Sequence, residues 1–104
     1  MNPFDPAAKL LTPHVLPRLM AFLAGDVPPP VTVEIDLTDR CNHRCPRCKG
    51  GRSGGELGTM EVFGYLRQLA DYGVRGIMLT GGGEPTLHPG LPDVIDESVR
   101  LGLE

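Results

Sequence analysis

The stretch that decides the fold is residues 31–48, VTVEIDLTDRCNHRCPRC. In its first half every second residue is apolar, and this alternation predicts a β-strand over residues 31–37 with one buried face. Its second half is a polar loop that holds all three cysteines of the chain. A half-buried strand therefore leads directly into a cysteine-rich loop. The expected buried face of the strand carries Val31, Val33, Ile35 and Leu37.

A helical pattern follows this loop. Residues 60–72 carry apolar side chains at the spacing of one helix face, which predicts an amphipathic helix. Thr59 is the expected N-cap, and Gly73 is the expected first residue beyond the helix. The side chains expected to face the core are Val62, Phe63, Leu66, Leu69 and Ala70.

The same order of elements then repeats. Residues 74–80 form a short apolar run, which predicts a second strand, and the loop GGGEPTLHPG follows it. Residues 91–101 predict a second helix that ends at Gly102. Its expected inward side chains are Leu91, Val94, Ile95 and Val99.

Alternating strands and helices predict an α/β fold, in which parallel strands are joined by right-handed crossovers. Residues 31–104 hold only two such βα units. Parallel sheets are normally covered on both faces and rarely leave long edges unpaired. We therefore expect these units to be the first part of a larger α/β sheet or barrel, so that the chain is a truncated product or half of a split protein.

The chain before the first strand has a different character. Residues 7–24 are broadly helical, but Pro13 and Pro17 interrupt the pattern, which predicts two short helices. The DVPPP stretch at residues 26–30 predicts a stiff, extended connector. The chain thus divides into a helical segment with its connector, residues 1–30, and the α/β unit, residues 31–104.

Composition excludes several classes of protein. The 104 residues include 10 Lys and Arg against 13 Asp and Glu, so a net charge of −3 does not favour bulk nucleic-acid binding. The hydrophobic fraction of 40% is too high for a disordered chain. Neither a membrane-spanning apolar run nor a secretory signal is visible. Cysteines confined to one short loop favour a metal site in a reducing cytoplasm over a disulfide framework.

The cysteine loop is the strongest functional signal. Cys41, Cys45 and Cys48 have the spacing C-x3-C-x2-C. A 4Fe-4S cluster normally takes four thiolate ligands, so three would leave one iron open to a ligand that is not protein. An open coordination position is typical of a catalytic metal rather than a structural one.

Other uses of these cysteines remain open on spacing alone. A zinc site would need His43 or His88 as its fourth ligand, and it would make the chain a non-catalytic zinc-binding or interaction module. A dithiol pair formed by Cys45 and Cys48 is similar to the C-x-x-C of thiol oxidoreductases, but it leaves Cys41 without a role. Plain buried cysteines would not gather in a polar loop.

A second candidate segment follows the second strand. Because parallel strands point the same way, the loops after both strands emerge at one edge of the sheet, where active sites of such folds lie. Residues 81–85, GGGEP, are therefore expected to face the cysteine loop. Their glycines allow the backbone to approach a ligand closely, and Glu84 offers a carboxylate to a cationic group.

Together the strand, the C-x3-C-x2-C loop, the helix, the next strand and the GGGEP segment resemble the N-terminal portion of radical S-adenosylmethionine (radical SAM) enzymes. The resemblance covers residues 31–104 and implies a partial parallel (β/α) barrel of TIM-like type, of which two βα units are present. It also implies that a 4Fe-4S cluster is bound by Cys41, Cys45 and Cys48. The fourth iron would be chelated by S-adenosylmethionine, whose methionine end would contact Gly81, Gly82, Gly83, Glu84 and Pro85.

The implied reaction is reductive cleavage of S-adenosylmethionine to a 5′-deoxyadenosyl radical, which abstracts hydrogen from an unidentified small-molecule or peptide substrate. An electron donor of flavodoxin or ferredoxin type, a cytoplasmic location and the remainder of the barrel, on this or another chain, are implied as well. No membrane or nucleic-acid partner is expected.

Basic residues surround the cysteines. They can offset the charge of thiolates and a cluster and attract a carboxylate, or they can form an ordinary solvated loop. Arg47 stands where the family often has an aromatic residue near the adenine, and its planar guanidinium can stack in a similar way. The basic residues of the loop are Arg40, Arg44, Arg47, Lys49 and Arg52.

Overall fold

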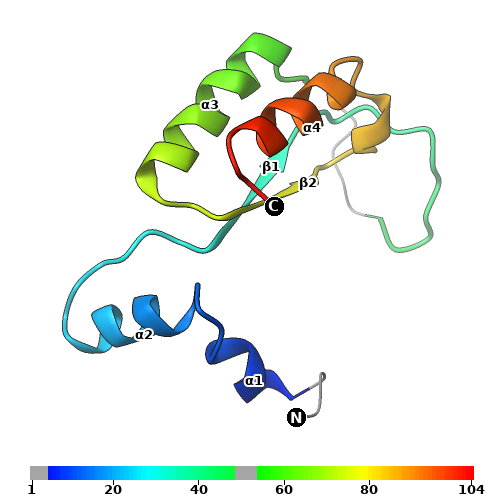
Figure 1. Ribbon diagram of the computed structural model, residues 1–104. Helices are drawn as coiled ribbons and strands as arrows, with labels where there is room; N and C mark the ends of the chain where they lie inside the picture. The colour runs from blue at the N-terminus through cyan, green and yellow to red at the C-terminus, as the bar shows by residue number, and fades with distance from the viewer. Residues whose placement is uncertain (1–4, 49–53) are drawn as a thin grey trace.

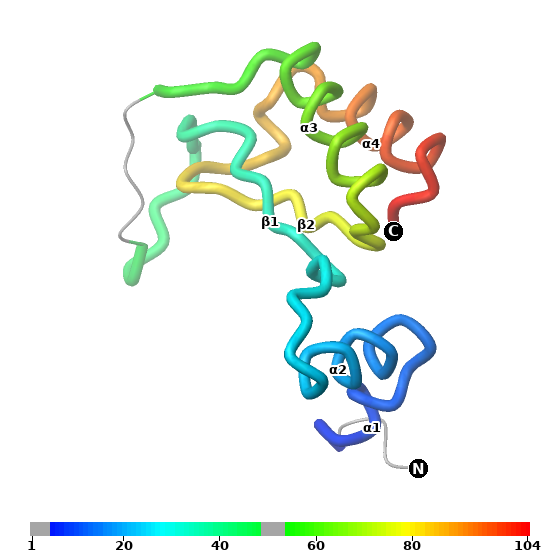
Figure 2. Tube along the Cα trace, turned by 90° about the vertical axis from the view of Figure 1, so that its left-hand side faces the viewer, coloured from blue at the N-terminus to red at the C-terminus, as the bar shows by residue number. Residues whose placement is uncertain are grey.

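The computed structural model describes residues 5–48 and 54–104. Strands β1 (Thr32–Asp36) and β2 (Gly76–Thr80) form a parallel two-stranded sheet within the described residues. Helices α3 (Thr59–Tyr72) and α4 (Leu91–Arg100) both lie over one face of this sheet, as the two views show (Figures 1 and 2). The predicted order of strand, helix, strand and helix is confirmed.

The sheet has one apolar face and one polar face. Its register pairs Thr32 with Gly76 at one end and Asp36 with Thr80 at the other. The face toward the helices carries Val33, Ile35, Ile77 and Leu79, as the alternation in β1 predicts. The core between sheet and helices consists of Ile35, Leu37, Val62, Leu66, Val74, Val94 and Leu103.

Helix α3 presents the predicted stripe to the core. Val62 and Leu66 are fully buried, while Phe63, Leu69 and Ala70 pack against them. Gly73 ends the helix in the left-handed region, at φ 105°, which glycine adopts without strain. The N-cap is Gly58 rather than the predicted Thr59, whose side chain instead lies against the backbone of Gly90.

Helix α4 (Leu91–Arg100) departs from the prediction for half of its inward side chains. Val94 is buried and Leu91 packs against the core, but the exposed fractions of Ile95 and Val99 are 46% and 69%. The prediction that both face inward is wrong, because the helix turns its Val94 side toward α3. Ile95 and Val99 instead border a hollow of about 140 Å³ at the outer flank of β2, beside Ile77, Leu79 and Leu103.

The N-terminal segment forms two short helices, α1 (Pro6–Leu10) and α2 (Leu16–Leu23), as the prolines predict. Arg18 ties α2 to the rest of the chain: its guanidinium donates to the carbonyl oxygens of Pro29 (3.0 Å) and Gly73. No helix in the described parts of the chain has the length and apolar character needed to cross a membrane.

The edge of β2 that faces away from β1 forms backbone hydrogen bonds with Glu104. The N–H of Glu104 donates to the Arg75 carbonyl oxygen (2.9 Å), and the N–H of Ile77 donates to the Glu104 carbonyl oxygen (2.8 Å). Glu104 thus forms hydrogen bonds with Arg75 and Ile77, the two neighbours of Gly76, which is the hydrogen-bond pattern of paired parallel strands. Glu104 therefore lies where a third parallel strand would pair with β2.

Candidate functional site

The segment at residues 81–85 lies directly against the start of the cysteine loop. The N–H of Glu84 donates to the carbonyl oxygen of Arg40 (2.8 Å), and the N–H of Gly83 donates to that of Thr38 (3.1 Å). Arg40 immediately precedes Cys41. The structure thus brings the two candidate segments together at the carboxyl edge of the sheet.

Gly83 makes this close approach possible. A Cβ atom at this position would lie 2.2 Å from the carbonyl oxygen of Arg40 and 2.7 Å from that of Thr38. These are main-chain atoms that cannot rotate away. At Gly83 the missing side chain therefore makes room for the backbone of the cysteine loop.

The cysteine loop is closed at its base. Thr38 and Glu56 form an antiparallel bridge, and the N–H of Asp39 donates to the Gly55 carbonyl oxygen (2.8 Å). The N–H of Leu57 donates to the Leu37 carbonyl oxygen (3.0 Å). The loop thus leaves the fold and returns to it at adjacent points.

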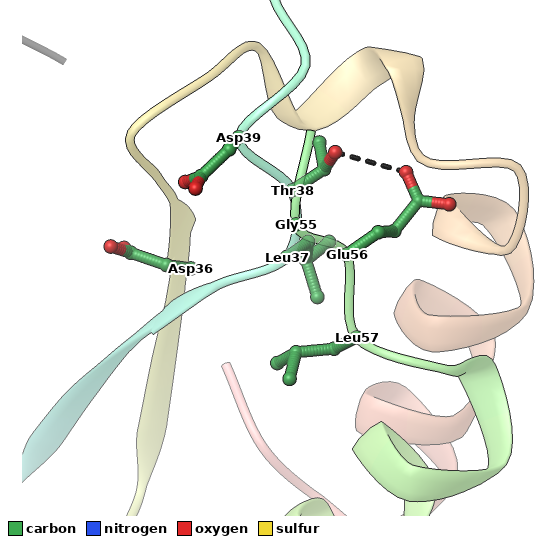
Figure 3. Close-up of a pocket in the computed structure, with 7 residues that line it drawn as sticks. All are labelled: Asp36, Leu37, Thr38, Asp39, Gly55, Glu56 and Leu57. Carbon is green, nitrogen blue, oxygen red and sulfur yellow. Dashed lines mark hydrogen bonds between the residues drawn. The ribbon is translucent and has the colours of Figure 1, made fainter. Parts of the chain in front are cut away.

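A pocket of about 250 Å³ lies at this base (Figure 3). In this view the carboxylates of Asp36 and Asp39 point to one side, and that of Glu56 points to the other. The Thr80 hydroxyl donates to Asp36 (3.0 Å), which joins the carboxyl ends of β1 and β2. The pocket is lined by Asp36, Leu37, Thr38, Asp39, Gly55, Glu56 and Leu57.

Arg40 and Glu56 form an ion pair at the base of the loop. Nε and Nη2 of Arg40 lie 2.9 and 2.7 Å from Oε2 of Glu56. The same carboxylate oxygen accepts a hydrogen bond from the hydroxyl of the buried Thr38 (2.9 Å). The hydrogen bond from Arg40, followed by that from Thr38, lowers the pKa of Glu56, so this carboxylate stays ionised near neutral pH.

Glu84 caps the short helix η1 (Pro85–Leu87). Its Oε1 accepts hydrogen bonds from the backbone N–H (3.2 Å) and the hydroxyl (2.9 Å) of Thr86. These bonds to Thr86 are the main reason why the pKa of Glu84 is lowered. Oε2 of Glu84 lies 3.6 Å from Nε2 of His43, which belongs to the cysteine loop. One carboxylate oxygen therefore shapes the GGGEP segment, and the other faces the loop.

The three cysteines differ in exposure. Cys41 is half-buried, and its Sγ accepts a hydrogen bond from the N–H of His43 (3.3 Å), whereas Cys45 and Cys48 are exposed. Among residues 5–48 and 54–104, no three His, Cys, Asp or Glu side chains are gathered as metal ligands. Three thiols on eight residues of chain nevertheless match the donor set of an iron–sulfur cluster with one open iron.

His88 serves the fold. It is 3% exposed, its Nδ1 accepts a hydrogen bond from the N–H of Gly90 (3.1 Å), and its Nε2 lies 2.7 Å from the Leu57 carbonyl oxygen. This pairing corresponds to the neutral ring with its proton on Nε2. Because both nitrogens are engaged, the zinc-site alternative that uses His88 as a ligand loses support.

The basic residues of the loop have different surroundings. Arg40 lies in the ion pair described above, and Arg47 is exposed. The stacking of Arg47 on an adenine therefore stays a prediction. Lys49 and Arg52 lie outside the described residues.

These observations define a class: an α/β protein with a thiol-rich loop and a glycine-rich segment side by side at the carboxyl edge of a parallel sheet. The PqqA peptide cyclase of Methylorubrum populi is 36% identical over 84 residues, which cover 77% of this chain and 22% of that protein. The PqqA peptide cyclase of Xanthomonas euvesicatoria is 38% identical over 80 residues, covering 73% and 21%. That of Rhodopseudomonas palustris is 36% identical over 78 residues, covering 71% and 20%.

The chain spans about a fifth of the length of these curated relatives. Each of these relatives carries the name PqqA peptide cyclase, which is the name of an enzyme that acts on a peptide. No protein-family model matches the chain. No solved structure matches it either.

Proposed function

We propose that this chain is the N-terminal part of a radical SAM enzyme that acts on a peptide. The observation that carries the proposal is the pair of backbone hydrogen bonds from Gly83 and Glu84 to Thr38 and Arg40. They place the GGGEP segment beside the first residue of a C-x3-C-x2-C loop. A peptide substrate is supported by the name of the relatives, PqqA peptide cyclase.

In this proposal Cys41, Cys45 and Cys48 hold a 4Fe-4S cluster, and residues 81–85 hold the methionine end of S-adenosylmethionine. When bound, a reduced cluster would supply the one electron needed to cleave S-adenosylmethionine into methionine and a radical able to take hydrogen from the substrate. The chain's own residues orient the two segments: Glu84 keeps an ionised carboxylate facing the loop, which suits a cationic amino group. In this proposal the side chains contribute binding and orientation, and the bond cleavage itself depends on the bound cofactors.

We also propose that the two βα units belong to a partial (β/α) barrel. Parallel pairing, two helices on one face and the ladder geometry of Glu104 on β2 support this fold. The opposite face of the sheet carries the exposed side chains of Glu34, Asp36 and Met78. In a barrel this polar face would line the interior, and Asp36 would lie at the carboxyl end of β1, the edge at which the active sites of barrels lie.

Metal content tests the assignment. The chain, prepared without oxygen and reconstituted with iron and sulfide, should bind about four irons and four sulfides and turn brown. Serine at Cys41, Cys45 or Cys48 should each abolish full loading, whereas the matched control Asn42→Ala in the same loop should load normally.

Two results would contradict this assignment. Folded protein that stays colourless and iron-free, or that takes up zinc in place of iron, would remove the radical SAM proposal. Thiol–disulfide exchange activity that Cys41→Ser keeps and Cys45→Ser abolishes would point to a dithiol pair at Cys45 and Cys48 instead.

A further inference from the structure

We propose that Arg40 and Glu56 act as positioning residues, here called the Arg40–Glu56 clamp, which fix Cys41 against the GGGEP segment. The purpose of this clamp rests on the proposed function, but its geometry does not. No motif in the sequence relates these two residues, and neither is a metal ligand or part of the GGGEP segment.

Arg40 contacts both sides of the cysteine loop and the adjoining GGGEP segment and η1. Its guanidinium contacts Glu56 through two nitrogens, and Nη2 also donates to the Leu87 carbonyl oxygen (2.8 Å) in η1. Its own carbonyl oxygen accepts the N–H of Glu84 (2.8 Å), and its own N–H donates to the Thr38 hydroxyl (3.1 Å). One residue therefore connects the outgoing loop, the returning loop, the GGGEP segment and η1.

Glu56 completes the arrangement from the returning side of the loop. Its Oε2 takes hydrogen bonds from Arg40 and from the Thr38 hydroxyl. A planar guanidinium bound through two nitrogens has a fixed orientation, which a lysine ammonium does not reproduce. The side chains of Arg40 and Glu56 are 48% and 27% exposed, and such exposed pairs add little to global stability. The clamp therefore acts on local geometry, and its loss need not unfold the protein.

Cys41 is the thiol that this geometry protects. It follows Arg40 in the chain and is half-buried, while Cys45 and Cys48 lie farther along the loop and are exposed. Releasing the clamp should free the backbone at Cys41 first. The effect of a clamp variant should accordingly be graded, largest at Cys41 and small at the other two cysteines.

The test measures thiol alkylation in the metal-free, reduced chain. Iodoacetamide labelling of each cysteine is followed over time by peptide mass spectrometry in the wild type and in Arg40→Ala, Arg40→Lys and Glu56→Gln variants. We expect Cys41 to react about threefold faster or more in Arg40→Ala and Glu56→Gln, with an intermediate rate in Arg40→Lys. The rates of Cys45 and Cys48 should change little.

Arg67→Ala is the matched control, because Arg67 pairs with Glu97 at 3.3 Å in the helical layer and its side chain is similarly exposed, at 55%. An unchanged Cys41 rate in Arg40→Ala and Glu56→Gln would overturn the clamp. Equal acceleration of all three cysteines, or the same acceleration in Arg67→Ala, would also overturn it, since that is the sign of general loosening.

Measuring iron loading distinguishes a failure of the clamp proposal from a failure of the proposed function. If the wild type loads iron and Arg40→Ala loads it less fully, with faster Cys41 labelling, both ideas stand. If the wild type binds no iron, the proposed function fails, and the labelling of metal-free protein still decides the clamp. If iron loading and Cys41 labelling are the same in wild type and Arg40→Ala, the clamp alone fails.

Discussion

Alanine at Gly83 should disrupt the contact on which the candidate site depends. The new Cβ atom would meet the Arg40 carbonyl oxygen at 2.2 Å, the Asp39 carbonyl carbon at 2.5 Å and the Thr38 carbonyl oxygen at 2.7 Å. Ordinary contact needs more than 3.4 Å, so the two segments must separate by about 1 Å. The backbone hydrogen bonds of Gly83 and Glu84 lie across this same gap.

The expected loss follows from these contacts. Each of the two hydrogen bonds contributes about 0.5–1.5 kcal/mol, and overpacking against immobile backbone costs about 1–3 kcal/mol. Gly83→Ala should therefore lower the free energy of unfolding by about 2–6 kcal/mol, or lower the free energy of local opening at this part of the site by the same amount. Urea unfolding measures the first quantity, and hydrogen exchange at the amides of Gly83 and Glu84 measures the second.

Gly64→Ala is the control, because Gly64 lies inside α3 and a Cβ atom there meets nothing within 4 Å. Alanine is the better helix former, so this variant should be more stable than wild type by about 0.5–1 kcal/mol. If Gly83→Ala matches the wild type in both urea unfolding and amide exchange, the described contact between the GGGEP segment and the cysteine loop is wrong.

Two further predictions concern buried polar groups. His88→Leu should lower the free energy of unfolding by about 2–4 kcal/mol, measured in urea, because the Leu57 carbonyl oxygen and the Gly90 N–H lose their partner; wild-type stability would contradict the buried role of this ring. The hydrogen bond from Arg100 is the main cause of the lowered pKa of Glu97. The ionised Glu97 carboxylate should therefore stabilise the folded state above its ordinary pKa of 4.5, and this stabilisation should be lost as the pH falls through the lowered pKa. Urea midpoints from about pH 6 to pH 3 should fall more in wild type than in Glu97→Gln, and equal slopes would refute this linkage.

The sequence predicted the elements well, because burial dictates their patterns. Alternation at Val33 and Ile35 marks a strand with one covered face, and the spacing of Val62 and Leu66 marks a helix on that face. The same logic failed for Val99, which is exposed. Periodicity shows which side of a helix is apolar, but it does not show whether another element covers that side.

The site was predicted in outline only. The topology of parallel strands was enough to bring the two candidate segments to one edge. The Arg40–Glu56 clamp was missed because the residues are far apart along the chain and meet only when the loop closes on itself. The burial of Glu97 was missed for a related reason, since its partner Arg67 lies on another helix.

The closed base of the cysteine loop has a consequence for how such proteins can vary. Residues 37–39 are held to residues 55–57 by backbone hydrogen bonds. The packing of the sheet and helices therefore does not depend on the course of the chain between these two segments. Lengthening a loop whose ends are already held adds little entropic penalty. Cysteine spacing and neighbouring charges can thus change, by evolution or by grafting, while the scaffold beneath keeps its shape.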